Sequence, residues 1–166
     1  MGLVRRLRWI CATSSLGWPV VIVQVAQPLS RFGFLPCACG AIRYQSAASP
    51  VVMLHCHCRD CQQSSGGPFS SFAVVPTEAF KLLQGSLRFH ASPSQMGGKT
   101  HRGFCPDCGA PILAKPDSAP HLAAIRAASL DDPSWFNPQV DVWTSDAHSW
   151  DQMNPALPKF ATYPHP

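Results

Sequence analysis

Seven of the eight cysteines in this 166-residue chain lie in three short clusters, a pattern typical of metal ligands. The clusters are Cys37-x-Cys39, Cys56-x-Cys58-x-x-Cys61 and Cys105-x-x-Cys108. Their thiols divide into four plus three. A closed structural zinc site takes four protein ligands in a tetrahedron, whereas a catalytic zinc takes three and leaves one position for water or substrate. The spacing therefore predicts one zinc site of each kind.

The first and last clusters suit a structural zinc. Cys105-x-x-Cys108-Gly109 has the form of a zinc knuckle, in which a tight turn aims two sulfurs at one metal and glycine supplies the backbone conformation. Cys37-x-Cys39-Gly40 supplies only two ligands and needs a second pair. A site made from both pairs would stabilise the fold, because the metal would close a long loop.

The middle cluster has no fourth cysteine nearby. The spare cysteine, Cys11, lies far upstream. Three histidines are the other candidates for a fourth ligand, which would give a closed Cys₃His site: His55, His57 and His101. If none of them binds, the zinc keeps an open position, and Cys56, Cys58 and Cys61 hold a catalytic ion. The residues alone leave both alternatives open.

Composition indicates one globular domain with free thiols. The chain is 46% hydrophobic and 13% charged, and its length allows one domain with a core. Its cysteine content is too low for a disulfide scaffold, and a cluster of three cannot pair internally without leaving a thiol over. Because metal-binding thiols must stay reduced, we expect a reducing, cytoplasmic location.

The charge distribution argues against nucleic acid as a partner. The formal charge is +4, but residues 1–36 contribute four arginines and no other charge, so residues 37–166 hold nine basic and nine acidic side chains. Seven thiolates on two Zn²⁺ ions would make this neutral body negative, which disfavours a phosphate-binding face.

The two ends of the chain lack the pattern of a packed domain. Residues 1–36 are an N-terminal extension with a basic start and a weakly signal-peptide-like apolar stretch, which polar residues interrupt. Its β-branched run at 20–25 predicts one strand. No apolar run reaches about 18 residues, so no membrane span is predicted. Residues 154–166 form a proline-rich tail that we expect to lie along the surface.

Residues 37–153 are predicted to form a mainly β domain that is rich in loops. Short apolar runs bounded by Gly, Pro and Ser predict strands at 41–45, 51–55, 69–75, 86–90, 110–114, 122–127 and 139–143. Only short helical turns are expected, at 60–64, 76–80 and 131–136.

The cysteine motifs and several later segments match the pattern of a known family. The matching segments are Cys37-x-Cys39-Gly40-Ala41-Ile42-Arg43-Tyr44, Cys56-His57-Cys58-x-x-Cys61 with Ser64, Ser65, Gly66 and Phe69, Arg102-x-Phe104-Cys105-x-x-Cys108-Gly109, Ser129-Leu130-Asp131-Asp132-Pro133, Val142-Trp143-Thr144 and Leu157-Pro158-x-Phe160. They resemble the CENP-V/GFA domain family over about residues 37–164. The resemblance implies several coiled antiparallel β-sheets, a structural zinc on the first and last motifs and a catalytic zinc on the middle one. The chain departs from the family at Leu35-Pro36, where members usually carry glycine.

The resemblance implies a zinc-dependent carbon–sulfur lyase. A small thiol such as glutathione would be the fourth ligand of the open zinc and would form or release an S-hydroxymethyl adduct with formaldehyde or another small aldehyde. A zinc held by three thiolates suits this chemistry, because a fourth thiolate ligand stays deprotonated at neutral pH. Arg59 and Arg102 are the basic residues nearest to ligand cysteines, so they are candidates for binding the thiol's carboxylates. The alternative is a non-catalytic, zinc-stabilised interaction module on the same fold.

Overall fold

The computed structural model describes residues 12–13, 19–20 and 35–164, and strands dominate this part of the chain. The strands are β1 (Ala12–Thr13), β2 (Pro19–Val20), β3 (Leu35–Pro36), β4 (Arg43–Ser46), β5 (Val52–Cys56), β6 (Ser70–Pro76), β7 (Phe80–Gln84), β8 (Arg88–Pro93), β9 (Lys99–Phe104), β10 (Pro111–Pro116), β11 (Leu122–Arg126), β12 (Val140–Val142) and β13 (Lys159–Phe160). The helical elements are α1 (Arg59–Ser65) and the 3₁₀ turns η2 (Thr77–Ala79), η3 (Ala127–Ser129), η4 (Pro133–Trp135) and η5 (Thr144–Asp146). The prediction of a mainly β fold with short helical turns is confirmed.

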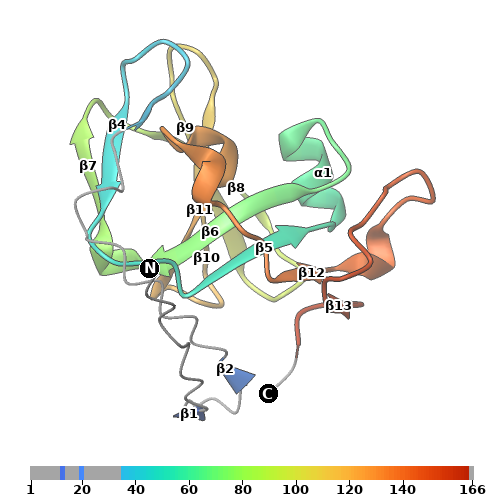
Figure 1. The fold of residues 1–166 in the computed structure, drawn as a ribbon. Coiled ribbons are helices and arrows are strands. Elements are labelled where there is room, and N and C mark those ends of the chain that lie inside the picture. The colour runs from blue at the N-terminus through green and yellow to red at the C-terminus, as the bar shows by residue number, and fades with distance from the viewer. Residues whose placement is uncertain (1–11, 14–18, 21–34, 165–166) are drawn as a thin grey trace, which may run out of the picture.

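The described strands form three sheets (Figure 1). The largest has the order β13-β12-β5-β6-β11-β10-β9-β8, a second has the order β3-β4-β7, and β1 pairs with β2. Most neighbours are antiparallel, as expected, but β12 runs parallel to both β5 and β13. A parallel pair requires a long connection between its strands, and here most of the domain separates β5 from β12. The C-terminal segment thereby returns to the sheet beside the strand that carries Cys56.

Each face of the eight-stranded sheet packs against its own apolar core, because successive side chains of a strand point to opposite faces. In β6, for example, Val75 belongs to one core and Val74 to the other. The first core contains Cys37, Ile42, Tyr44, Val75, Cys105, Ile112, Leu113, Ala123 and Ile125, and the second contains Leu54, Cys56, Cys61, Phe72, Val74, Ala114, Val142 and Trp143. The two cysteine groups are therefore built into different cores.

Helix α1 begins directly after Cys58 and ends at Ser65, with Gly66 as its C-cap residue. Gly66 has a φ of 73°, the left-handed conformation that glycine adopts at low cost, and its N–H donates to the Gln62 carbonyl at 2.9 Å. Ser70 Oγ of β6 donates to the Cys61 carbonyl at 2.8 Å. This short helix therefore holds Cys61 against the second core.

The strands that the sequence did not predict have physical explanations. β9 is polar along most of its length, KTHRGF, so no apolar alternation marks it, although β8 and β10 pair with it on both sides. β7 starts immediately after η2, where only a helical turn was expected. β13 lies in the proline-rich tail and is short and exposed, yet it pairs with β12.

The strand predicted at 20–25 falls almost entirely outside the described residues. Of these six residues the structure describes only Val20, which belongs to β2. Within the part of the chain that the structure covers, no helix has the length and apolar character needed to cross a membrane.

Candidate functional site

The first and last cysteine motifs form the turns of two β-hairpins. Residues 37–40 join β3 to β4, and residues 105–109 join β9 to β10. Each turn is closed by a backbone hydrogen bond, from Gly40 N to Cys37 O at 2.8 Å and from Gly109 N to Cys105 O at 2.9 Å. Both glycines have a positive φ, 80° and 74°, which other residues resist. The three-stranded and eight-stranded sheets meet at this group of cysteines.

The four sulfur atoms of these turns lie at the spacing of a tetrahedral zinc site. All four are within 4.8 Å of one another, with Cys37 Sγ 3.3 Å from Cys39 Sγ and Cys39 Sγ 3.7 Å from Cys105 Sγ. A tetrahedron with Zn–S bonds of about 2.3 Å has edges of about 3.8 Å, whereas the sulfurs of a disulfide are about 2.05 Å apart. The four thiols, Cys108 included, therefore fit a metal ion better than they fit a disulfide.

Hydrogen bonds decide which of these four thiols ionises most readily. Burial raises the pKa of Cys37, but the Ile42 N–H, 3.2 Å from its sulfur, and the neighbouring thiols outweigh burial and lower the pKa to about 6. A hydrogen bond from the Ala110 backbone also lowers the pKa of Cys108, whereas burial raises that of Cys105. One thiol of each hairpin is thus prepared to bind a cation as thiolate.

The middle motif gathers three sulfur atoms where β5 ends and α1 begins. Cys56 is the last residue of β5, Cys58 directly precedes α1, and Cys61 lies in its first turn. The three Sγ atoms lie within 4.8 Å of one another. Cys56 and Cys61 are buried and Cys58 is half-buried. We call these three residues the Cys₃ cluster, and the four cysteines of the hairpin turns the Cys₄ cluster.

No histidine of the described residues joins the Cys₃ cluster. His55 Nδ1 lies 2.9 Å from Ser71 Oγ, and His101 Nε2 lies 2.9 Å from Asp117 Oδ1. Cys11 lies outside the described residues. The geometry therefore favours a site with three protein ligands over a closed Cys₃His site.

His57, between two of the cysteines, is engaged in a buried polar network. Its ring is fully buried, with Nδ1 2.5 Å from Asp151 Oδ2 and Nε2 3.3 Å from Asp141 Oδ1, and both carboxylates are almost inaccessible. The His57 backbone N–H also donates to the Val142 carbonyl at 2.9 Å. These contacts fix the loop from Cys56 to Cys58 against β12 and the segment that follows it.

Contacts within the Cys₃ cluster shift the pKa values of its three thiols in different directions. Hydrogen bonds from the other two thiols, helped by the nearby Arg102, lower the pKa of Cys58 to about 3. Hydrogen bonds with Cys58 and Cys61, together with burial, raise the pKa of Cys56 well above its ordinary value. A hydrogen bond with Cys56 lowers the pKa of Cys61, but the Cys58 thiolate and burial outweigh it and raise that pKa to about 12. The positive charge of Arg102 thus favours ionisation of this cluster.

A cavity of about 230 Å³ is lined by Ser64 of α1 and by residues of β8, β9, β10 and β11, and its polar lining is Ser64, His90, Arg102 and Arg126. None of the described cysteines lines it. The strand register explains why Arg102 points there. Arg102 lies opposite His90 on β8 and opposite Ala114 on β10, and Ala114 belongs to the second core. Residues directly opposite on neighbouring strands share a face. Arg102 therefore projects from the same face of the sheet as the Cys₃ cluster.

The two arginines predicted to bind substrate lie in different surroundings. Arg102 lines the cavity, where its Nη2 is 3.1 Å from Asp60 Oδ2. Arg59 is exposed and does not line the cavity, and its Nη1 donates to Gln62 Oε1 at 2.7 Å. The structure therefore brings Arg102 towards the Cys₃ cluster and leaves Arg59 at the surface of α1.

Comparison with known proteins agrees with this geometry. The family model described as glutathione-dependent formaldehyde-activating enzyme, or GFA, matches residues 35–146. This chain belongs to the GFA family. The matched segment contains all seven cysteines of the two clusters, so the GFA domain includes both candidate metal sites.

A solved structure has a similar fold. The chain is similar to a crystal structure of a Rhodobacter sphaeroides protein, with a TM-score of 0.50, 15% sequence identity, and coverage of 77% of this chain and 99% of that one. At this identity the similarity concerns the fold alone.

Two residues beside the Cys₃ cluster of this GFA domain were missed by sequence reasoning. Arg126, the last residue of β11, is only 5% exposed and interacts electrostatically with Cys61. The sequence does mark Arg126 as unusual, because it is the single charged residue of an otherwise apolar strand, LAAIR. Tyr163 of the tail packs against the second core beside Cys56, and burial and the nearby thiols raise its pKa well above its ordinary value. No sequence signal places this tyrosine beside a cysteine at the other end of the domain.

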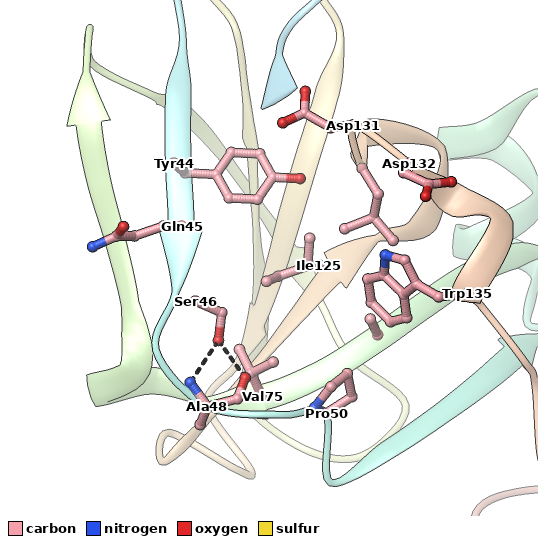
Figure 2. A pocket seen from close by; sticks show the side chains of 12 residues that line it. Tyr44, Gln45, Ser46, Ala48, Pro50, Val75, Ile125, Asp131, Asp132 and Trp135 are labelled. Carbon is pink, nitrogen blue, oxygen red and sulfur yellow. Dashed lines mark hydrogen bonds between the residues drawn. The ribbon is translucent and has the colours of Figure 1, made fainter. Parts of the chain in front are cut away.

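A smaller pocket, lined by Tyr44, Trp135 and their neighbours, contains none of the cysteines (Figure 2). Its volume of about 30 Å³ is the room of a single water molecule. The Tyr44 hydroxyl donates to the Ser129 carbonyl at 2.7 Å, and burial raises the Tyr44 pKa to about 12. The pocket therefore lacks the size of a thiol site.

Proposed function

We propose that this protein is a zinc-dependent carbon–sulfur lyase that acts on the adduct of a small thiol, such as glutathione, with formaldehyde or another small aldehyde. One observation carries the proposal: three cysteines meet with no fourth protein ligand among the described residues, near a cavity lined by arginine. Three thiolates leave a zinc position for substrate. Membership of the GFA family supports the same chemistry.

We assign two zinc ions to the chain. A structural zinc would bind Cys37, Cys39, Cys105 and Cys108, and a catalytic zinc would bind Cys56, Cys58 and Cys61. The all-sulfur donor sets support zinc, because thiolates favour it over harder divalent ions. All seven cysteines are free thiols, which supports a site of action in a reducing compartment such as the cytoplasm.

The catalytic zinc, when bound, would take the substrate thiol as its fourth ligand and keep it deprotonated at neutral pH. In the synthetic direction the sulfur bonds to the aldehyde carbon, and the proton that the thiol loses ends on the carbonyl oxygen, which becomes a hydroxyl. The reverse direction breaks the same bond, and neither involves net oxidation. Arg102 supplies a cation at the cavity for a substrate carboxylate. Arg59, at the surface of α1, stays a prediction for a second carboxylate.

A direct test is the rate of adduct formation. The zinc-loaded protein is mixed with glutathione and ¹³C-formaldehyde, and exchange between free formaldehyde and the S-hydroxymethyl adduct is followed by NMR. We expect exchange faster than in buffer, faster than with equimolar free Zn²⁺, and lost in Cys58→Ser. If no acceleration occurs with several thiols and aldehydes, the lyase proposal fails and the zinc-stabilised interaction module takes its place.

A further inference from the structure

Arg126 is a buried cation without a carboxylate partner in the part of the chain that the structure describes. It is 5% exposed, and none of the ion pairs among these residues includes it. Arginine is almost never this buried unless it is paired. Arg102, in contrast, is already paired with Asp60. The fold therefore maintains one positive charge near the Cys₃ cluster that its own carboxylates do not neutralise.

The guanidinium of Arg126 is held in place while most of its donors remain free. Its Nη2 donates to Ser64 Oγ at 2.6 Å, and the group lies over the Phe72 ring, 4.7 Å from the centroid. A guanidinium has five N–H donors. The other donors are not sealed in the core, because the buried side-chain atoms that lack partners in the described residues are carboxylate oxygens of Asp141 and Asp151. Arg126 lines the cavity, which makes its side chain accessible to a ligand there.

Arg126 lies between the cavity and residues that contact the Cys₃ cluster. Ser64, its hydrogen-bond partner, follows Cys61 by less than one turn of α1, and its hydroxyl also donates to the Cys61 carbonyl at 3.2 Å. Phe72, the ring beneath the guanidinium, belongs to the same core as Cys56 and Cys61. Arg126 also interacts electrostatically with Cys61, Cys56 and Cys58, so a ligand whose sulfur lies at the Cys₃ cluster can extend a second group towards Arg126.

We infer that Arg126 is the anchor of an anion subsite that selects thiols bearing a carboxylate over neutral thiols of the same length. The inference rests on the proposed function, because the thiol must first bind at the Cys₃ cluster. The planar fork of a guanidinium matches a carboxylate and forms two parallel charge-assisted hydrogen bonds with it. For a thiol with a single carboxylate, Arg126 rather than Arg102 provides the selectivity, because the charge of Arg102 is shared with Asp60.

The test compares two thiols of matched size, 3-mercaptopropionate and its neutral amide, 3-mercaptopropionamide, binding to the zinc-loaded full chain in isothermal titration calorimetry. With the unaltered protein we expect 3-mercaptopropionate to bind at least about 10-fold more tightly, the effect of a charge-assisted hydrogen bond. Arg126→Met should remove that difference while 3-mercaptopropionamide binds as before. Arg126→Lys should keep part of it. Arg43→Met, which removes an exposed arginine of the other sheet, is the matched control and should change neither affinity.

The outcomes that overturn the inference are distinct. Equal affinity of the two thiols for the unaltered protein removes the selectivity, and this measurement does not depend on whether any variant folds. A selectivity that survives Arg126→Met assigns it to another residue. Equal weakening of both thiols in Arg126→Met makes Arg126 a counter-ion of the sulfur site and not a carboxylate anchor. If neither thiol binds the unaltered protein, the proposed function itself fails.

Discussion

The two cysteine clusters should contribute unequally to stability, and the difference follows from the lengths of the loops they close. The Cys₄ cluster connects Cys39 to Cys105 across 66 residues, which corresponds to about 4 kcal/mol of loop-closure free energy. The Cys₃ cluster closes only the short segment from Cys56 to Cys61, for which the same relation gives about 1.5 kcal/mol. Loss of a ligand should therefore cost more in the Cys₄ cluster by roughly 2 kcal/mol.

The matched variants are Cys108→Ser and Cys58→Ser. Neither thiol is among the buried cysteines, so each substitution removes a metal ligand with little loss of core packing. A difference of about 2 kcal/mol corresponds to roughly 4–8 °C in a domain of this size. Thermal unfolding of the zinc-loaded proteins, followed by circular dichroism, should show the lower Tm for Cys108→Ser. Equal Tm values, or a lower Tm for Cys58→Ser, would refute the division into a structural and a catalytic cluster.

Three further outcomes follow from the site geometry. Native mass spectrometry with a mild chelator should show that the zinc ion of the Cys₃ cluster leaves first, and the Cys58→Ser protein should lack that labile ion. Simultaneous loss of both ions would contradict unequal sites. Zinc loading of the Cys₃ cluster at neutral pH should release about two protons, because the raised pKa values of Cys56 and Cys61 keep both thiols protonated beforehand. Zinc affinity should therefore fall as the pH falls. Release of no protons in weakly buffered solution would contradict this prediction. His57→Asn should lower the free energy of unfolding in urea by about 3–5 kcal/mol, because it breaks a buried network. The control His101→Asn, at the exposed pair with Asp117, should lower it by less than about 1 kcal/mol. Equal losses of stability would show that the buried network is not stabilising.

The clustering of the cysteines could be predicted from the sequence because metal-ligand spacing is a local property. A C-x-x-C turn brings two sulfurs together whatever the rest of the chain does, and glycine after Cys39 and Cys108 marks the turns. The apolar runs likewise identified β5, β6 and β11 within a few residues. These features depend on neighbours along the chain, which the sequence shows directly.

The surroundings of the Cys₃ cluster could not be predicted, because they depend on strand order and register. Arg126 reaches the cluster only because β11 lies between β6 and β10 with that residue on the second core's face. Asp141 and Asp151 meet His57 only because β12 pairs in parallel with β5. Polar β9 carried no periodic signal, so the strand that places Arg102 was also missed.

The Cys₃ cluster should accept a thiol as the fourth ligand of its metal. Cobalt(II) substitution tests this most directly, because its visible bands report the number and type of ligands. Glutathione added to the cobalt-substituted protein should change the bands of the Cys₃ site and leave those of the Cys₄ site, isolated in Cys58→Ser, unchanged. A spectrum that stays the same at saturating glutathione would contradict the claim.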